Sequence, residues 1–200
     1  MLLRNRKFSL FGMAAGALAL MVSTSVPLAY GHGYTTTPIS RAKHCANGTV
    51  QNCGAIQWEP QSTEGPKGFP ALGPSDGLLC SAGLSQFHEL DDQRGGAWPA
   101  TQLTAGAAYT FSWHLTAAHA TTDFKYYMTK QGWDQNAPLT RSALDLNPFL
   151  TVDMDGTRPP SDVSHPGTLP SGRTGRHMIL AVWTIEDTGN AFYQCSDVNF

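Results

Sequence analysis

The segment AYGHGY, residues 29–34, places a histidine directly after what resembles a secretory cleavage site. Ala29 and Gly31 are small residues spaced as in an A-x-G type site, so a cut after Gly31 would make His32 the first residue of the mature chain. An N-terminal histidine offers two nitrogen ligands, because its α-amine has a reference pKa of about 7.7–8.0, far below that of lysine. The amine and the imidazole Nδ1 can therefore chelate one metal ion together.

A second imidazole from elsewhere in the chain would complete a T-shaped set of three nitrogens. Nitrogen ligands in a tetragonal plane favour Cu(II), and copper also heads the affinity order of the divalent first-row ions. Such a site keeps open positions where oxygen species can bind and redox chemistry can occur. The pattern therefore predicts one copper ion per chain as cofactor.

Six other histidines could supply the second imidazole: His44, His88, His114, His119, His165 and His177. His114 is expected on the solvent face of a strand, His165 in a loop, and His44 is restrained by the neighbouring Cys45. His119 lies where the strand-like run LTAAHATTD gives way to a loop, and strand ends are where β-sandwiches place their sites. Spacing alone favours His119 only slightly over the others.

Residues 1–31 have the organisation of a secretory signal peptide. A basic start, MLLRNRK, precedes an apolar run of about 15 residues and a polar stretch that ends in small residues. That run is short for a membrane span, and no later segment is long and apolar enough to cross a bilayer. We expect a secreted, extracellular protein; an uncleaved N-terminal anchor is the alternative.

The remaining residues, 32–200, suit a single domain with a sizeable core. The leader contains Arg4, Arg6 and Lys7 and no acid, so 10 of the 13 basic residues and all 15 acidic ones remain, for a net charge of about −5. A weakly acidic chain with no basic run is a poor partner for nucleic acid or an anionic membrane. We therefore expect an uncharged partner and a monomeric protein.

Four cysteines remain after the leader: Cys45, Cys53, Cys80 and Cys195. An even number in an exported chain indicates two disulfides, for which three pairings are possible. A Cys45–Cys53 bridge would close a short local loop and leave Cys80 and Cys195 for a long-range bridge. A thiolate metal site is disfavoured because no CxxC pair is present.

The hydrophobic pattern divides the chain into two parts. Residues 40–104 are rich in proline and glycine, which favours a long irregular region with short helices, such as a turn or two in SAGLSQFHELDD. A loop region of this length is usually functional. The stretches AAYTFSWHLTA and TDFKYYMTK then alternate as strands, HMILAVWTI fits a buried strand, and AFYQCSDVNF fits a last one. Short strands without helical periodicity predict an all-β antiparallel sandwich.

Several segments in the same order resemble one known family: HGYTTTPISRAKHC, IQWEPQSTEGPKGFP, FSWHLTAAHATTDFKYYMT, GWDQNAPLTR and HMILAVWTIEDTGNAFYQCSDV. They are similar to the bacterial lytic polysaccharide monooxygenases of auxiliary activity family ten, the chitin-binding type-4 domain family. The similarity runs from His32 to the C-terminus. It implies an immunoglobulin- or fibronectin III-like β-sandwich with one copper ion in a histidine brace.

The resemblance also assigns roles around the copper. His32 would supply its amine and Nδ1, and His119 its Nε2. Phe192 matches the aromatic residue at one axial side of the metal, and Ala117 the small residue at the other. Glu64, in STEG, matches an acid near the copper that helps to position the oxygen species.

The family binds crystalline polysaccharide on a flat face around the metal. The matching positions in this chain are Trp58, Glu59, Pro60, Thr116, Asp187 and Asn190. An exposed aromatic ring can stack on sugar rings, and short polar groups can bond hydroxyl and N-acetyl groups. Trp58 is expected to be exposed, since it lies in a loop beside acids. One departure is Ala118, where many relatives carry a bulkier basic residue before the second histidine.

The implied activity is oxidative cleavage of β-1,4 glycosidic bonds in crystalline chitin, at C1, with an external electron donor and O₂ or H₂O₂. WEPQSTEG and the TAxH pattern resemble the chitin-active branch, and cellulose is the alternative substrate. Other readings remain open: a non-catalytic chitin-binding protein or adhesin, a copper carrier, or a glycosidase that uses Glu59 and Glu64 as its carboxyl pair. The Cys80–Cys195 bridge occurs in only part of the family.

Overall fold

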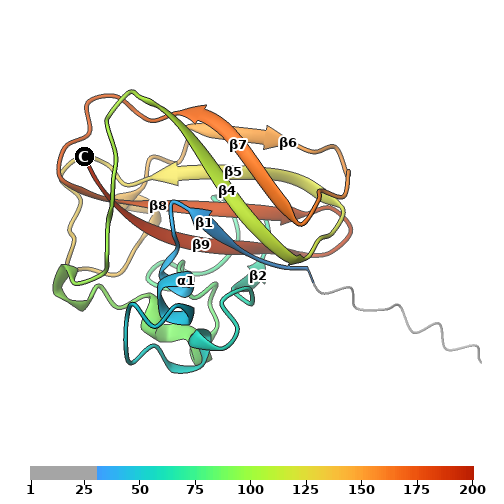
Figure 1. Cartoon of the computed structure of the whole chain (residues 1–200), viewed down its shortest axis with the longest axis horizontal. Helices are drawn as coiled ribbons and strands as arrows, with labels where there is room; N and C mark the ends of the chain where they lie inside the picture. Colours follow the sequence, from blue (N-terminus) through green and yellow to red (C-terminus); the bar gives the residue numbers. More distant parts are fainter. Residues whose placement is uncertain (1–30) are drawn as a thin grey trace, which may run out of the picture.

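The computed structural model describes residues 31–200, so the predicted leader lies outside the described residues except for Gly31. Two β-sheets pack face to face, and a layer of loops and short helices covers the outer face of the larger sheet (Figure 1). This is the predicted immunoglobulin-like antiparallel sandwich. No helix in the described part of the chain is long and apolar enough to cross a bilayer.

The smaller sheet has three strands in the order β1-β4-β7. They are β1 (His32–Thr37), β4 (Ala108–Ala117) and β7 (Asp162–Thr168). Both outer strands run antiparallel to the central β4.

The larger sheet has the order β2-β9-β8-β5-β6, with a short β3 added parallel to the end of β9. Its strands are β2 (Glu64–Pro66), β3 (Thr101–Gln102), β5 (Thr121–Met128), β6 (Leu150–Asp153), β8 (Arg176–Ile185) and β9 (Asn190–Asn199). β8 and β9 are buried along nearly their whole length, because both faces of this sheet are covered.

The space between the sheets holds one hydrophobic cluster, and alternation along the strands determines its members. Phe111, Trp113 and Leu115 of β4 point into it, and Phe124 and Tyr126 of β5 face them. The predicted alternation in both strands is confirmed. The nearly continuous apolar run 177–185 is also confirmed as the buried strand β8.

The loop layer packs a second cluster against the outer face of the larger sheet. Its helices are α1 (Arg41–Ala46) and the 3₁₀ turns η1 (Gly54–Gln57), η2 (Ser85–Leu90), η3 (Arg94–Gly96) and η4 (Arg141–Ala143). The irregular region 40–104 is therefore confirmed, and η2 lies where a short helical turn is predicted. The sequence analysis missed α1, whose N-cap is Ser40, because the helix is only 6 residues long.

Buried charges tie this layer to β9. The Arg41 guanidinium, fully buried, donates from Nε to Asp197 Oδ2 at 2.7 Å and from Nη1 to the Leu90 carbonyl at 2.8 Å. Arg176 donates to the other Asp197 oxygen at 2.8 Å. Since every one of these charges has a partner, the network fixes α1 and the end of η2 against the sheet.

The structure contains two disulfides, in the pairing in which Cys45 and Cys53 close a short local loop. Cys45–Cys53 closes a loop within the α1 region, with a sequence separation of 8. Cys80–Cys195 spans 115 residues and joins the loop layer to β9.

The two bridges are expected to contribute unequally to stability. In the chain-entropy treatment, loss of Cys80–Cys195 in a Cys80→Ser/Cys195→Ser variant lowers the free energy of unfolding by about 5 kcal/mol, and loss of the short Cys45–Cys53 loop by about 2.5 kcal/mol. Urea unfolding of the two double variants beside the parent chain measures the difference. A larger loss for the Cys45→Ser/Cys53→Ser variant would contradict loop length as the determinant.

His165 corrects a prediction: it does not lie in a loop but in β7, buried in the sandwich. Its Nδ1 lies 2.7 Å from the Tyr126 hydroxyl, which also accepts the Trp113 indole N–H at 3.0 Å. Burial lowers the pKa of His165 to about 4. Burial also lowers the pKa values of His44 and His177.

These histidines make stability depend on pH. Between about pH 6.5 and 4 the unfolded chain binds a proton at His165 that the folded chain does not, so the free energy of unfolding falls as pH falls, by about 3 kcal/mol from this residue. We expect His165→Gln to flatten that slope, measured by urea unfolding at pH 7 and pH 4.5. The exposed-face variant His114→Gln is the control, and equal slopes in the parent and His165→Gln would contradict the assignment.

Candidate metal centre

Strand pairing brings His32 to the end of the sandwich where β4 finishes. His32 stands opposite Ala117, the last residue of β4, and the Thr116 hydroxyl donates to the His32 carbonyl at 3.4 Å. His119 follows two residues later, before β5 begins at Thr121. The start of β1, the β4–β5 connection and the turn between β8 and β9 meet at this end (Figure 1).

The glycine after His32 is required by close packing. A Cβ atom at Gly33 would lie 2.6 Å from Leu115 Cδ2 and 3.3 Å from the Trp183 ring, so a larger residue there would force the buried Leu115 side chain to move. The Gly33 amide also donates to the Gln61 carbonyl at 3.2 Å, which ties β1 to the loop that carries Trp58. The HG pair in the sequence is therefore a positioning element as well as a ligand signal.

His119 is oriented by Asp187, which lies in the turn between β8 and β9. His119 Nδ1 lies 3.3 Å from Asp187 Oδ1, and the side chain of His119 is 12% exposed. The Thr121 hydroxyl donates to the His119 carbonyl at 2.9 Å. A carboxylate on Nδ1 favours the tautomer that leaves Nε2 available to a metal ion.

Phe192 and Glu64 lie beside His32 on paired strands. The Phe192 ring is fully buried, and its centroid is 6.2 Å from that of the His32 ring, tilted by 52°. Glu64 stands opposite Phe192 in the β2–β9 register. Asn190, the first residue of β9, donates to Glu64 Oε1 at 2.7 Å, which fixes the carboxylate at this end of the sheet.

The donor set fits a copper ion of the kind predicted. His32 and His119 supply imidazoles from adjacent strand ends, and the third nitrogen would be a main-chain amine. Such a site has only two ligating side chains, so it is consistent with the lack of any group of three His, Cys, Asp or Glu side chains suited to a metal within residues 31–200. The alternative ligand His114 lies on the outer face of the small sheet, 2.7 Å from Asp162.

The family model described as "lytic polysaccharide mono-oxygenase, cellulose-degrading" matches residues 32–198. The chain belongs to this family, auxiliary activity family ten. The match covers nearly every residue after the predicted leader.

Two curated relatives are substantially longer than the chain. The AA10 family lytic polysaccharide monooxygenase C of Mycosarcoma maydis is 49% identical over 98% of this chain and 60% of its own length. GlcNAc-binding protein A of Shewanella oneidensis is 45% identical over 97% of this chain and 40% of its own. The chain thus spans about half the length of these relatives.

Solved structures match the described fold closely. The AA10 lytic polysaccharide monooxygenase from Streptomyces lividans is 63% identical, with a TM-score of 0.83, over 84% of this chain and 100% of that one. A Bacillus amyloliquefaciens CBM33 protein, solved in complex with Cu(I), is 41% identical, with a TM-score of 0.76, over 84% of this chain and 99% of its own.

The residues predicted to bind polysaccharide are not equally accessible. Trp58 is 81% exposed, as predicted, and Thr116 and Asp187 are exposed as well. Glu59 and Asn190 are half-buried. Pro60 is buried, so it shapes the loop that presents Trp58 and Glu59 rather than offering a free surface of its own.

Gln194 is a positioning residue that the sequence analysis missed. Its buried amide lies within hydrogen-bond distance of the carbonyls of Gly33 (3.4 Å) and Pro60 (3.1 Å) and of the Thr63 hydroxyl (2.7 Å), so it joins β9 to β1 and to the Trp58 loop. A polar residue inside the otherwise buried strand AFYQCSDV was the available signal. Arg158, which lines a cavity with His119 and Asp187, was missed too, because it carries no motif.

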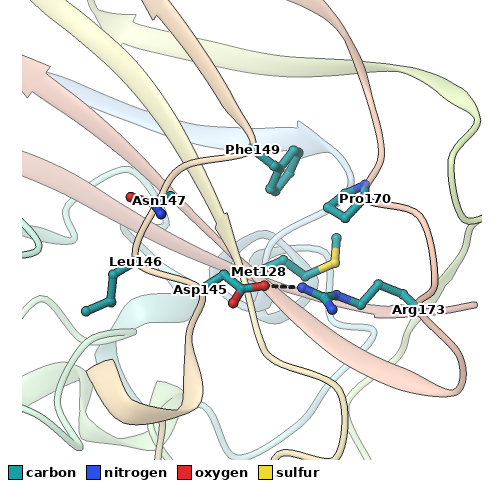
Figure 2. A pocket seen from close by; sticks show the side chains of 7 residues that line it. All are labelled: Met128, Asp145, Leu146, Asn147, Phe149, Pro170 and Arg173. Atoms are coloured by element: carbon teal, nitrogen blue, oxygen red, sulfur yellow. Dashed lines mark hydrogen bonds and ion pairs between the residues drawn. The ribbon is translucent and has the colours of Figure 1, made fainter.

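A separate cavity of about 260 Å³ lies at the opposite end of the sandwich. Met128, the last residue of β5, lines it with Phe149 and Pro170, as do Asp145 and Arg173, which form an ion pair (Figure 2). It contains none of the predicted site residues, so the metal centre does not extend into it.

The Asp187–His119 contact is expected to support metal binding. Asp187→Ala removes the group that orients the imidazole, and we expect the affinity for Cu(II) to fall at least tenfold. Isothermal titration with Cu(II) on chain that begins at His32 measures it. Asp162→Ala is a matched control because it removes the carboxylate from a second histidine, His114, outside the site. Equal affinities in the two variants would contradict the role of Asp187.

Proposed function

We propose that this monooxygenase is a secreted, copper-dependent enzyme that cleaves β-1,4 bonds of crystalline chitin by oxidation at C1. The observation that carries the proposal is the pairing of His32 with the end of β4, two residues from a His119 that Asp187 orients. Removal of residues 1–31 would free the amine that completes the donor set. The Cu(I) complex of the Bacillus amyloliquefaciens relative supports copper as the metal.

Chitin is favoured as substrate because a 45% identical relative is named a GlcNAc-binding protein. The sequence segments around Trp58 and His119 also resemble the chitin-active branch. The matching family model is described as cellulose-degrading, so cellulose is the second candidate substrate and belongs in every assay.

The chain's own residues account for positioning. His32 and His119 would hold the metal with their three nitrogens, and the buried Phe192 and the small Ala117 would limit which groups can approach it. When bound, copper supplies the redox chemistry by which O₂ or H₂O₂, with an external electron donor, hydroxylates a C–H bond. Glu64, held by Asn190, offers a carboxylate that can accept or return a proton beside that reaction.

The exposed face would dock the polysaccharide. Trp58 presents an indole ring for stacking on a pyranose, while Thr116 and Asp187 present hydrogen-bonding groups at the same end of the sandwich. Gln194 and the Cys45–Cys53 bridge restrain the loop that carries Trp58. The binding face is therefore preorganised and would hold the scissile bond in one place. No acid–base carboxyl pair is needed for this reaction.

A product assay tests the proposal. The chain is expressed with its leader, the mass of a chain beginning at His32 is verified, and the copper-loaded protein is incubated with ascorbate and β-chitin or cellulose. We expect soluble oligosaccharides ending in aldonic acids from chitin, and none from His32→Ala, detected by mass spectrometry. Release of oxidised products only from cellulose would contradict chitin as the substrate. No oxidised products from either polymer would contradict the proposed activity.

A non-catalytic chitin-binding protein is the second candidate, favoured by the name of the Shewanella oneidensis relative. The same samples separate the two functions: chitin binding that survives metal removal, without oxidised products, selects the binding protein. Trp58→Ala is expected to weaken chitin binding under either function, so it reports on the face and not on the chemistry.

A further inference from the structure

A cavity of about 350 Å³ lies at the rim of the metal centre. His119, Ala120, Asp187 and Arg158 line it. Arg158 belongs to the connection between β6 and β7, to which the sequence patterns and the family resemblance give no role. It is the one basic side chain among the residues that line this cavity.

The backbone that carries Arg158 is held rigidly. The preceding turn is closed by the Thr157 amide, which donates to the Met154 carbonyl at 2.8 Å, and Asp155 and Gly156 at its tip have φ values of 49° and 78°. Two further backbone bonds join the turn to Thr121: its amide donates to the Thr157 carbonyl at 3.2 Å, and its carbonyl accepts from the Gly156 amide at 2.9 Å.

Thr121 links this turn to the metal centre. It is fully buried, its hydroxyl donates to the His119 carbonyl, and the Trp183 indole donates to that hydroxyl at 2.8 Å. The residue after Arg158 is the buried Pro159, which keeps the Arg158 backbone extended. The backbone of the exposed Arg158 is therefore held in place near His119 by these hydrogen bonds.

The charges across the cavity define what can occupy it. Asp187 and Arg158 face the same space, and no ion pair joins them in the described part of the chain. An anion there would be repelled by Asp187, and a cation by Arg158. A neutral group with an acceptor on one side and a donor on the other satisfies both, since a carboxylate only accepts and a guanidinium only donates.

An amide is the neutral group that carries both functions in one rigid plane. We propose that Arg158 is a specificity-determining residue that donates to the acetamido carbonyl oxygen of an N-acetylglucosamine unit. Asp187 accepts the acetamido N–H, and the methyl group lies against Ala120. The inference rests on the proposed function and deepens it: this cavity distinguishes an N-acetylated β-1,4 polymer from an unsubstituted one.

Binding isotherms test the role of Arg158. The copper-loaded protein without reductant is equilibrated with β-chitin, with cellulose and with extensively deacetylated chitin, and the free protein is measured. Loss of one charge-assisted hydrogen bond predicts that Arg158→Leu binds β-chitin about tenfold more weakly and the other two polymers within twofold of the parent. Arg158→Lys, which keeps the charge, is expected to retain part of the affinity for chitin.

Lys130→Leu is the matched control, since it removes an equal charge just beyond the far end of β5. If Arg158→Leu lost equal affinity for chitin and for cellulose, Arg158 would contact both polymers without distinguishing them. If its isotherm on chitin were unchanged, Arg158 would not bind the substrate. Either result overturns the proposal. The oxidised-product assay is independent of these isotherms, so failure of the monooxygenase reaction would be recognised separately.

Discussion

The antiparallel pairing of β1 with β4 determines where the candidate metal centre forms. It carries His32 to the end of β4, and the chain then needs only two more residues to reach His119. Gly33 permits the close approach to Leu115 and Trp183 that this pairing demands. A ligand pair is thus produced by one local register, and a shift of one residue would turn His32 to the other face of the sheet.

Around that pairing, the fold fixes each surrounding group through a different element. The turn between β8 and β9 supplies Asp187, the β2–β9 pairing supplies Glu64 and Phe192, and Gln194 joins the Trp58 loop to β1. The loop layer is itself bound to β9 by Cys80–Cys195 and by the buried Arg41–Asp197 pair. The exposed face therefore rests on a support that is covalently and electrostatically connected to the metal centre.

The sequence predicted the features that local pattern controls. Alternation identified β4 and β5, an apolar run identified β8, and the cleavage-site context singled out His32. Features that depend on contacts between residues far apart in the chain could not be predicted from the sequence. His165 is a core residue because it hydrogen-bonds to Tyr126 on another strand. Arg41 is buried because Asp197, 156 positions later, neutralises it. Spacing could not single out His119 among six histidines, because its partner Asp187 lies 68 positions away.

The direction of β9 has a consequence for longer members of the family. The strand begins at Asn190 beside the metal centre and runs to Asn199 at the opposite end of the sandwich, where Phe200 pairs with Gly175. Any domain joined after this strand is tethered at the end of the sandwich away from the candidate metal centre. In the proposed function, an appended module would anchor the protein to a surface from behind, with a linker that sets its reach, while the face around the candidate metal centre stays clear.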